Sequence, residues 1–357
     1  MTRPWFVCVC VLLFPVLVQA ASRTIGPGED LAQAYATLKP CDTLLLRGGT
    51  YNPGKIGTFA SAAMPSGTPD CPITIAAVPG ERVVLGGGQP GVRLPEGTHD
   101  LIFDGLHAIG PGAQFFASCP GVERITFQNG TVDSQNQVSD NAIAGCGGFI
   151  TVRNTVVTGA DVYGIYWFGH DSLFDNLDIT GNCGYGVHIY HYAATDVYNN
   201  TLRNSRIHDN DAGGCQNKGV DNGGIVLSSG EGNKACNNEI WNNFGGIQVD
   251  YRCTNCVVAN NTIHDNRGFG LVVNNGDPGK TVGTVLRNNL VYNNGGEQIV
   301  DQGIGTRMEG NATSAGPGVG MQAGGAADCG GSGGSGPPVA ETTPPAPRNL
   351  RVLAIVP

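Results

Sequence analysis

The stretch ANNTIHDNRGFGLVV (residues 259–273) joins a run of Asn and Gly to an apolar strand, and the chain repeats it with variations. In each copy an Asn lies three residues before an aliphatic side chain. The pairs are Asn129/Val132, Asn154/Val157, Asn176/Ile179, Asn204/Ile207, Asn237/Ile240, Asn260/Ile263 and Asn288/Val291. Successive Asn residues are 25, 22, 28, 33, 23 and 28 positions apart. A recurring period of about 20–50 residues is typical of architectures built from stacked units.

A second short strand follows about ten residues after most of these Asn residues. Its copies are GIYW (164–167), GVHI (186–189), GIVL (224–227), GIQV (246–249) and GLVV (270–273). One unit cannot bury its own apolar face, but stacked units can. Three short strands per period predict an all-β, right-handed parallel β-helix with three parallel sheets. A leucine-rich solenoid would need regular Leu spacing, and a β-propeller would need longer, four-stranded blades.

The recurring Asn has a physical reason in such a fold. Asn tolerates the left-handed backbone conformation that a tight bend between strands requires. Its amide can also bond the Asn one coil away, so we expect an inward-facing Asn ladder. The dipeptides His208-Asp209 and His264-Asp265, which follow the repeat, are interpreted as polar residues at strand ends on the outer surface.

The two ends of the chain differ in composition from the repeat. Residues 1–20 carry one Arg, an apolar run and a small-residue end, which predicts a signal peptide. Residues 28–38 resemble a short amphipathic helix that would cap the first coil, and residues 42–51 and 71–77 are predicted to be the first strands. The β-helix is thus expected over 21–313, followed by a flexible Gly/Ser/Pro-rich tail over 314–357.

Charge and cysteine content limit the partners and the compartment. The formal net charge of −9 argues against nucleic acid as a partner. No segment after the signal peptide is apolar enough to span a membrane, and we expect a monomer that is secreted or periplasmic. Ten of the twelve Cys residues follow the signal peptide, and disulfides are the default interpretation in an exported protein.

The expected register of the coils suggests which Cys residues pair. Neighbouring coils are about 4.8 Å apart, within the range that a disulfide tolerates. The proposed pairs are Cys41 with Cys71, Cys119 with Cys146, Cys183 with Cys215, and Cys236 with Cys253 or Cys256, which leaves Cys329 without a partner. Zinc at Cys253-x-x-Cys256 is disfavoured, because a second pair at metal-ligand spacing is missing.

The repeated words NNTIHDN, NNEIWNN and RNNLVYNN, each followed by a Gly-rich strand, resemble the secreted bacterial right-handed parallel β-helix proteins of the pectate-lyase superfamily. The resemblance covers roughly residues 42–310. It implies that the GIxV strands form the first sheet and that the ladder Asn lies between the second and third sheets. It also implies a polysaccharide substrate on the outer face of the first sheet. Members include uronan lyases, hydrolases, epimerases and binding proteins, so the fold alone does not decide the function.

Alternation along the first-sheet strands predicts which side chains face this groove. One outward column is Tyr166, His188, Val226, Gln248 and Val272, and a second is Phe168, Tyr190, Ser228, Asp250 and Asn274, with His170, Tyr192 and Arg252 just beyond. Aromatic rings suit sugar rings, and His or Tyr can transfer protons. Substrate binding is therefore assigned to Tyr166, Phe168, His170, Tyr192, Gln248 and Asp250. The alternative is an aromatic stack that only stabilises the outer surface.

A β-elimination lyase needs a positive group at the uronate carboxylate and a base for the C5 proton. The insertion at 209–224 enters the first sheet and supplies Lys218 and Asp221. Lys218 or Arg252 is the candidate for neutralising the carboxylate. The candidate bases are His188, Tyr190 and Lys218.

Calcium stays open as a cofactor, with Asp221 and Asp250 as its candidate ligands. The resemblance implies several Asp residues on the first sheet in calcium-dependent lyases, and only Asp250 lies squarely there. The paired carboxylates of a hydrolase and the Asp-Pro-His word of alginate epimerases are missing from this sequence. The sequence thus favours a polysaccharide lyase. The alternatives are a carbohydrate-binding or surface protein, a glycoside hydrolase and a C5-epimerase.

Overall fold

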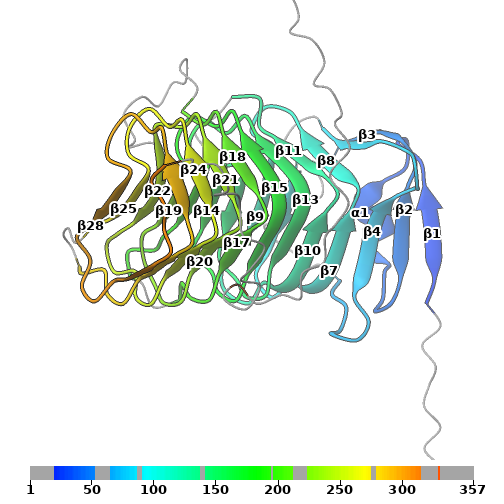
Figure 1. The fold of residues 1–357 in the computed structure, drawn as a ribbon. Coiled ribbons are helices and arrows are strands. Elements are labelled where there is room, and N and C mark those ends of the chain that lie inside the picture. Colours follow the sequence, from blue (N-terminus) through cyan, green and yellow to red (C-terminus); the bar gives the residue numbers. More distant parts are fainter. Residues whose placement is uncertain are drawn as a thin grey trace, which may run out of the picture.

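The computed structural model describes residues 20–52, 65–86, 91–136, 141–193, 196–211, 223–274, 279–314 and Cys329. These residues form one parallel β-helix, whose coils are stacked in sequence order from β1 at one end to β28 at the other (Figure 1). The predicted fold class is therefore confirmed. Within this part of the chain, no helix has the length and apolar character needed to cross a membrane.

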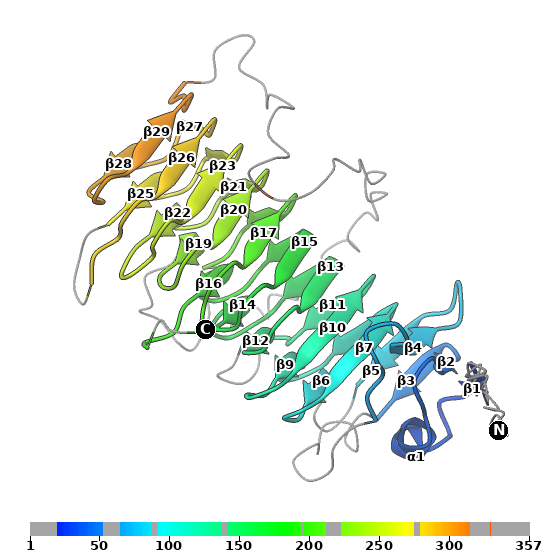
Figure 2. The ribbon, with the colours of Figure 1, turned by 90° about the horizontal axis from the view of Figure 1, so that it is seen from below.

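Three rows of parallel strands run along the stack (Figure 2). The first row is a nine-stranded sheet: β6 (Gly91–Leu94), β9 (Gln114–Ala117), β12 (Ile143–Gly145), β14 (Ile165–Trp167), β16 (Val187–Ile189), β19 (Gly223–Leu227), β22 (Gly245–Val249), β25 (Leu271–Val273) and β28 (Ile299–Asp301). The second row is β1 (Ser22–Ile25), β2 (Thr43–Leu46), β4 (Ile73–Ala77), β7 (His99–Asp104), β10 (Glu123–Gln128), β13 (Thr151–Thr158), β15 (Leu173–Thr180), β17 (Thr201–Arg203), β20 (Lys234–Cys236), β23 (Val257–Ala259), β26 (Val285–Arg287) and β29 (Arg307–Glu309). The third row is β3 (Gly49–Tyr51), β5 (Val83–Leu85), β8 (Leu106–Ile109), β11 (Thr131–Asp133), the ends of β13 and β15, β18 (Arg206–His208), β21 (Glu239–Trp241), β24 (Thr262–His264) and β27 (Leu290–Tyr292).

The repeat aligns its aliphatic residues into inward columns. Ile207, Ile240, Ile263 and Val291 pair in register on neighbouring strands of the third row, and all four are fully buried. Since side chains alternate along a strand, the residues between them face outward. A continuous apolar core therefore runs the length of the stack.

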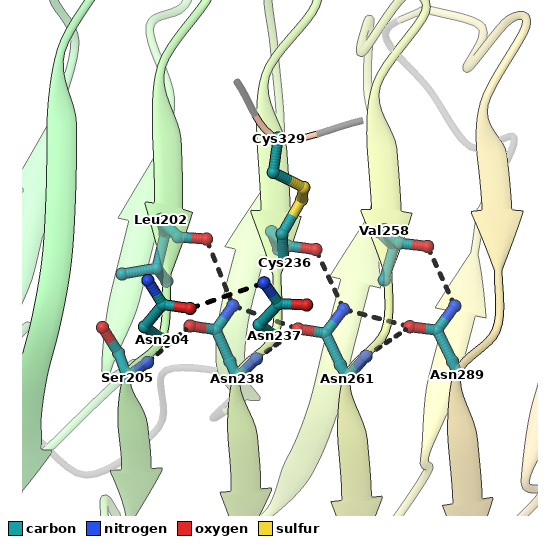
Figure 3. The surroundings of a disulfide bond; sticks show 11 residues. Leu202, Asn204, Ser205, Cys236, Asn237, Asn238, Val258, Asn261, Asn289 and Cys329 are labelled. Carbon is teal, nitrogen blue, oxygen red and sulfur yellow. Dashed lines mark hydrogen bonds between the residues drawn. A yellow bond between two sulfur atoms is a disulfide. The ribbon is translucent and has the colours of Figure 1, made fainter. Parts of the chain in front are cut away.

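The bend Asn residues adopt the predicted backbone conformation but do not form the buried ladder. All seven Asn residues of the repeat have φ between 51° and 57°. The side chains of Asn129, Asn154, Asn176, Asn204 and Asn237 bond along the outer surface, as from Asn176 to Asn154 at 2.9 Å. The buried ladder is one residue later, where Asn238, Asn261 and Asn289 bond in series at 3.0 Å (Figure 3).

This correction has a simple reason. In the word NNTI, the second Asn is two residues before the aliphatic, so it faces the same, inner side of the coil. A second buried ladder, not predicted, runs through Asn182, Asn210, Asn243, Asn266 and Asn294. Both ladders pair amides that the bends would otherwise bury without partners.

Glycine begins or directly precedes six of the nine first-row strands, because the neighbouring coils pass very close to it. A Cβ added at Gly246 would lie 2.2 Å from the Gly270 carbonyl oxygen of the next coil. No other residue can occupy such a position without moving the backbone. The recurrent Gly-Ile and Gly-Val words are thus a packing requirement of the stack.

The N-terminal cap is present and shorter than predicted. Helix α1 (Leu31–Ala36) begins after the N-cap Asp30, whose side chain accepts from the Gln33 amide at 3.1 Å. Leu31 and Tyr35 are buried against the first coils. The sequence did not predict β1, which pairs with β2 and extends the second row beyond the first expected strand.

Two predicted disulfides are confirmed, Cys41–Cys71 and Cys119–Cys146. The prediction for Cys236 is wrong. Cys253 and Cys256 lie on either side of one bend, with Cα atoms 6.0 Å apart, and bond each other. Cys236 bonds Cys329 instead (Figure 3).

Cys329 was expected to lack a partner and to belong to a flexible tail, yet it is joined to the outside of the stack. Cys215, the predicted partner of Cys183, lies outside the described residues. So do the predicted signal peptide up to residue 19 and the tail apart from Ser314 and Cys329. Disulfide bonds such as Cys41–Cys71 persist in oxidising compartments.

Candidate functional site

The outer face of the nine-stranded sheet carries the two predicted columns. Pairing in register aligns Tyr166, His188, Val226, Gln248 and Val272 across five coils. The backbone hydrogen bonds between neighbouring first-row strands continue for one residue past each strand end. They align the second column, which contains Tyr190, Ser228, Asp250 and Asn274. The polar and aromatic members of both columns are concentrated around β14, β16, β19 and β22.

His188 lies at the centre of a group of tyrosine rings. Its ring centroid is 5.5 Å from that of Tyr166 and 5.2 Å from that of Tyr190, which stacks on it. The ring centroids of Tyr163 and Tyr185 lie 5.2 and 5.0 Å from that of His188. We call these five residues the His188 cluster.

Tyr163 and Tyr185 were missed in the sequence. Both precede a first-row strand, in the words YGIYW and YGVHI. Their rings stack on each other at 5.2 Å from neighbouring coils. The repeated Tyr-Gly before two successive strands was the signal that would have found them.

His188 is held as a neutral imidazole. Burial lowers its pKa from 6.5 to about 3, because removal from water penalises the charged form. Its Nε2 is 3.0 Å from the Ser228 hydroxyl oxygen, while its Nδ1 is buried and has no hydrogen-bond partner. A neutral imidazole can accept a proton, but a bound molecule reaches the buried Nδ1 only when a neighbouring ring moves.

Asp250 is the nearest carboxyl in the second column. The Gln248 side-chain amide donates to its Oδ2 at 2.5 Å, and its Oδ1 is buried without a hydrogen-bond partner. Burial raises the pKa of Asp250, against the lowering influence of hydrogen bonds from Ser228 and Gln248. Burial likewise raises the pKa of Tyr163 and Tyr166, which keeps both phenols protonated.

Comparison with known proteins agrees with the fold described above. A family model described as the right handed beta helix region matches residues 142–313, which include the whole His188 cluster. This chain is a right-handed parallel β-helix protein. No curated protein sequence matches it.

Two solved structures are similar in fold to this β-helix protein. The mannuronan C-5 epimerase AlgE4 A-module of Azotobacter vinelandii is 16% identical, with a TM-score of 0.51, over 75% of this chain and 78% of that one. The pectate lyase Pel9A is 17% identical, with a TM-score of 0.51, over 83% and 82%. At these identities the likeness shows the fold alone.

The remaining predicted residues of the β-helix protein are spread around the cluster. Phe168 contacts Tyr166 and stacks on His191. Tyr192 is 76% exposed at the rim, beside His191.

His170 is set apart from the His188 cluster. It begins the next row, where its ring stacks on Tyr198 at 4.8 Å and its Nδ1 is 3.0 Å from Asp171 Oδ2. His170 therefore contacts Tyr198 and Asp171, and its ring is not part of the His188 cluster.

The candidate cations are placed only in part. Arg252 is exposed in the turn after Tyr251, whose ring contacts Tyr190 at 5.7 Å. The Arg252 side chain lies against Gly279 of the next coil. Lys218 and Asp221 lie outside the described residues.

The groups at Asp250 do not fit a calcium site in the described part of the chain. No three His, Cys, Asp or Glu side chains gather there closely enough to hold a metal ion. The neighbours of Asp250 are the donating Gln248 amide and the Ser228 hydroxyl, whereas calcium prefers several carboxylate and carbonyl oxygens. We therefore derive no chemical step through a metal.

Proposed function

We propose that this β-helix protein is an exported polysaccharide lyase that cleaves uronic-acid-containing polymers by β-elimination. The observation that carries the proposal is the neutral His188, with its unpaired Nδ1, among four tyrosine rings on the outer face of the first sheet. Tyrosine faces bind sugar rings, and a neutral imidazole accepts a proton. The disulfides support export.

The proposed reaction uses groups with separate tasks. His188 takes the C5 proton once the rings that cover its buried Nδ1 move aside for the sugar, and the electron pair of the broken C–H bond forms the double bond between C4 and C5. The C4–O bond breaks, its electrons stay on the leaving oxygen, and the phenol of Tyr190 or a water gives that oxygen a proton. Arg252, with Lys218, neutralises the uronate carboxylate, which makes the C5 proton more acidic.

A C5-epimerase is the second candidate, and it shares the first step. The similarity in fold to a mannuronan C-5 epimerase favours keeping it. An epimerase returns a proton to C5 from the opposite face, with the chain intact. The two activities therefore differ in whether the C4–O bond breaks.

The purified protein should be screened against pectate, alginate and glycosaminoglycans for products that absorb in the near ultraviolet. We expect absorbance on at least one polymer, and a loss of about 100-fold or more in rate for the His188→Ala, Tyr190→Ala double variant. His264→Ala is the matched control. That histidine also stacks on aromatic rings, Trp241 and Tyr292, but on the third row, away from the groove.

Two results would contradict the lyase. One is retained binding with no absorbing product on any polymer, which favours a carbohydrate-binding protein. The other is deuterium incorporation at C5 from heavy water without chain cleavage, which favours the epimerase. Equal rates in the wild type and the double variant would remove His188 and Tyr190 from the mechanism.

A further inference from the structure

The outward column that contains His188 continues beyond the cluster toward the N-terminal end of the first row. Strands β16, β14, β12, β9 and β6 follow one another in this sheet (Figure 2). Pairing in register aligns His188 and Tyr166 with Ala144, Phe116 and Arg93. Because side chains alternate along a strand, Phe116 and Arg93 lie on the same outer face of the sheet as His188.

Arg93 is held in place by partners that carry no charge. Its guanidinium donates to the Gln114 side-chain oxygen at 2.5 Å and lies 5.7 Å from the ring centroid of Phe116. Gln114 is 1% exposed, and its amide nitrogen donates to the Asn141 backbone carbonyl of the next coil at 2.9 Å. The Gln114 oxygen is thereby directed toward Arg93. Glutamine orients the guanidinium without cancelling its charge.

Most other described arginines form an ion pair with a carboxylate, in contrast to Arg93. The pairs are Arg23 with Glu29, Arg47 with Glu81, Arg124 with Asp100, Arg203 with Asp175, Arg206 with Asp178, Arg267 with Asp211 and Arg287 with Glu309. In the described part of the chain, the partners of the Arg93 side chain are Gln114 and Phe116, and none of them is acidic. Arg93 is also the only lysine or arginine on the nine first-row strands.

We propose that Arg93 and Phe116 form a second subsite on this face, which binds the carboxylate and the ring of a uronate unit at a distance from His188. The half-buried guanidinium has five N–H donors, and their fork matches the two oxygens of a carboxylate. The Phe116 ring provides an apolar surface for the sugar. The substrate class rests on the proposed function, whereas the subsite concerns binding and not bond cleavage.

The position of Arg93 sets the length of chain that can reach both sites. Neighbouring strands are about 4.8 Å apart, so the four steps from β16 to β6 separate Arg93 from His188 by roughly 19 Å. One step is close to the length of one sugar unit in an extended polymer. Ala144 is 3% exposed, so the bound chain would contact the rings of Phe116 and Tyr166 on either side of it. A uronate hexamer is therefore long enough to occupy both sites.

The test is isothermal titration calorimetry of the full chain at low salt, with hexamers of galacturonate and of mannuronate. Arg93→Gln should weaken binding of the preferred hexamer by about tenfold, since it removes a charge-assisted hydrogen bond. The methyl ester of the same hexamer has no carboxylate, so the wild type and Arg93→Gln should bind it equally. Raising the salt concentration should reduce the difference for the acid, because a half-exposed ion pair is screened.

Arg153→Gln is the matched control. Arg153 also donates to a glutamine oxygen, that of Gln128, at 2.7 Å, but it is exposed on β13 in the second row. The change in net charge is the same, and hexamer binding should stay at the wild-type level. Gln114→Glu is a second test, because the new carboxylate would pair with Arg93. It should weaken hexamer binding about as much as Arg93→Gln, although the guanidinium is kept.

Equal hexamer affinities in the wild type and Arg93→Gln would overturn the inference, as would an equal loss in Arg153→Gln or no hexamer binding by the wild type. Near-ultraviolet absorbance, recorded in parallel, separates this inference from the lyase proposal. Absorbing product combined with binding that is independent of Arg93 removes the subsite and keeps the lyase. Binding that depends on Arg93, without product from any polymer, keeps the subsite and removes the lyase.

Discussion

Asn261 shows how much one residue of the buried ladder contributes. Its side-chain nitrogen donates to the Ala235 carbonyl and to Asn289, while its oxygen accepts two bonds from Asn238. Replacing it with Ala leaves several buried groups unpaired, at about 1–3 kcal/mol each. We expect Asn261→Ala to lower the free energy of unfolding by about 3 kcal/mol or more, measured by urea denaturation.

The control for this prediction is Asn176→Gly. Asn176 has φ of 53°, which Gly adopts without strain, and its amide bonds Asn154 at the exposed surface. Its replacement should cost less than about 1 kcal/mol. Equal losses for the two variants would mean that the buried ladder has no special role.

At the scale of elements, strands β18, β21, β24 and β27 form an outer stack of rings. His208 stacks on Trp241 at 4.2 Å, and His264 stacks on Tyr292 at 5.2 Å. The sequence prediction that His208 and His264 lie on the outer surface is confirmed, but it did not foresee their stacking. Asp178 bonds His208 Nε2 at 2.9 Å.

The pair of His208 and Asp178 predicts a pH dependence of stability. Burial alone would lower the pKa of His208, but hydrogen bonds to Asp178 and Asp209 outweigh it and raise the pKa above 6.5. The stabilisation that protonated His208 provides is complete below pH 6.5. It is lost as the pH rises through the pKa that His208 has in the folded protein. Burial would raise the pKa of Asp178, but His208 and Arg206 lower it below 3.8. The stabilisation that ionised Asp178 provides is complete above pH 3.8. It is lost as the pH falls through the pKa that Asp178 has in the folded protein.

The pair should therefore stabilise most between pH 3.8 and pH 6.5. We expect His208→Gln to lower the free energy of unfolding by about 1 kcal/mol at pH 5 and by less at pH 9, in urea titrations. In an Asp178→Asn background the difference between the two pH values should shrink. A loss that is the same at both pH values would assign the effect to ring stacking alone.

The elements also show what the sequence could and could not predict of the site. The column from Tyr166 through His188 to Gln248 could be predicted from the repeat. The period of the repeat determines which residues of neighbouring strands pair, and alternation along each strand determines which side chains face outward. The contact between His188 and Ser228 did not follow. It joins different columns of neighbouring coils, so it depends on side-chain rotamers that a repeat pattern does not encode.

At the scale of the whole molecule, the order of the coils could be predicted from the sequence, but the disulfide between segments far apart in the chain could not. The confirmed disulfides join neighbouring coils at equivalent positions, where register brings Cα atoms within 4.5 to 5.6 Å. Cys329 follows the last repeat, so no register relates it to Cys236. Its pairing depends on the path of a segment that carries no repeat pattern.

The Cys236–Cys329 disulfide should stabilise the protein more than a short-range one, because a disulfide that spans more residues restricts the unfolded chain more strongly. Cys236 and Cys329 are 93 residues apart, whereas Cys253 and Cys256 are 3 apart. On loop length alone, the long bond is worth about 5 kcal/mol and the short bond about 2 kcal/mol. All four sulfurs are buried, so the paired Cys→Ala variants leave comparable cavities and serve as controls for each other.

The Cys236→Ala, Cys329→Ala variant should therefore unfold at a clearly lower urea concentration than the Cys253→Ala, Cys256→Ala variant. Peptide mapping of the wild type under non-reducing conditions should recover Cys236 and Cys329 in one linked pair of peptides. Equal midpoints in the two variants would mean that the long bond does not constrain the unfolded chain. A Cys329 recovered as a free thiol would mean that the stack forms without this attachment, because the ladders and the apolar core then suffice.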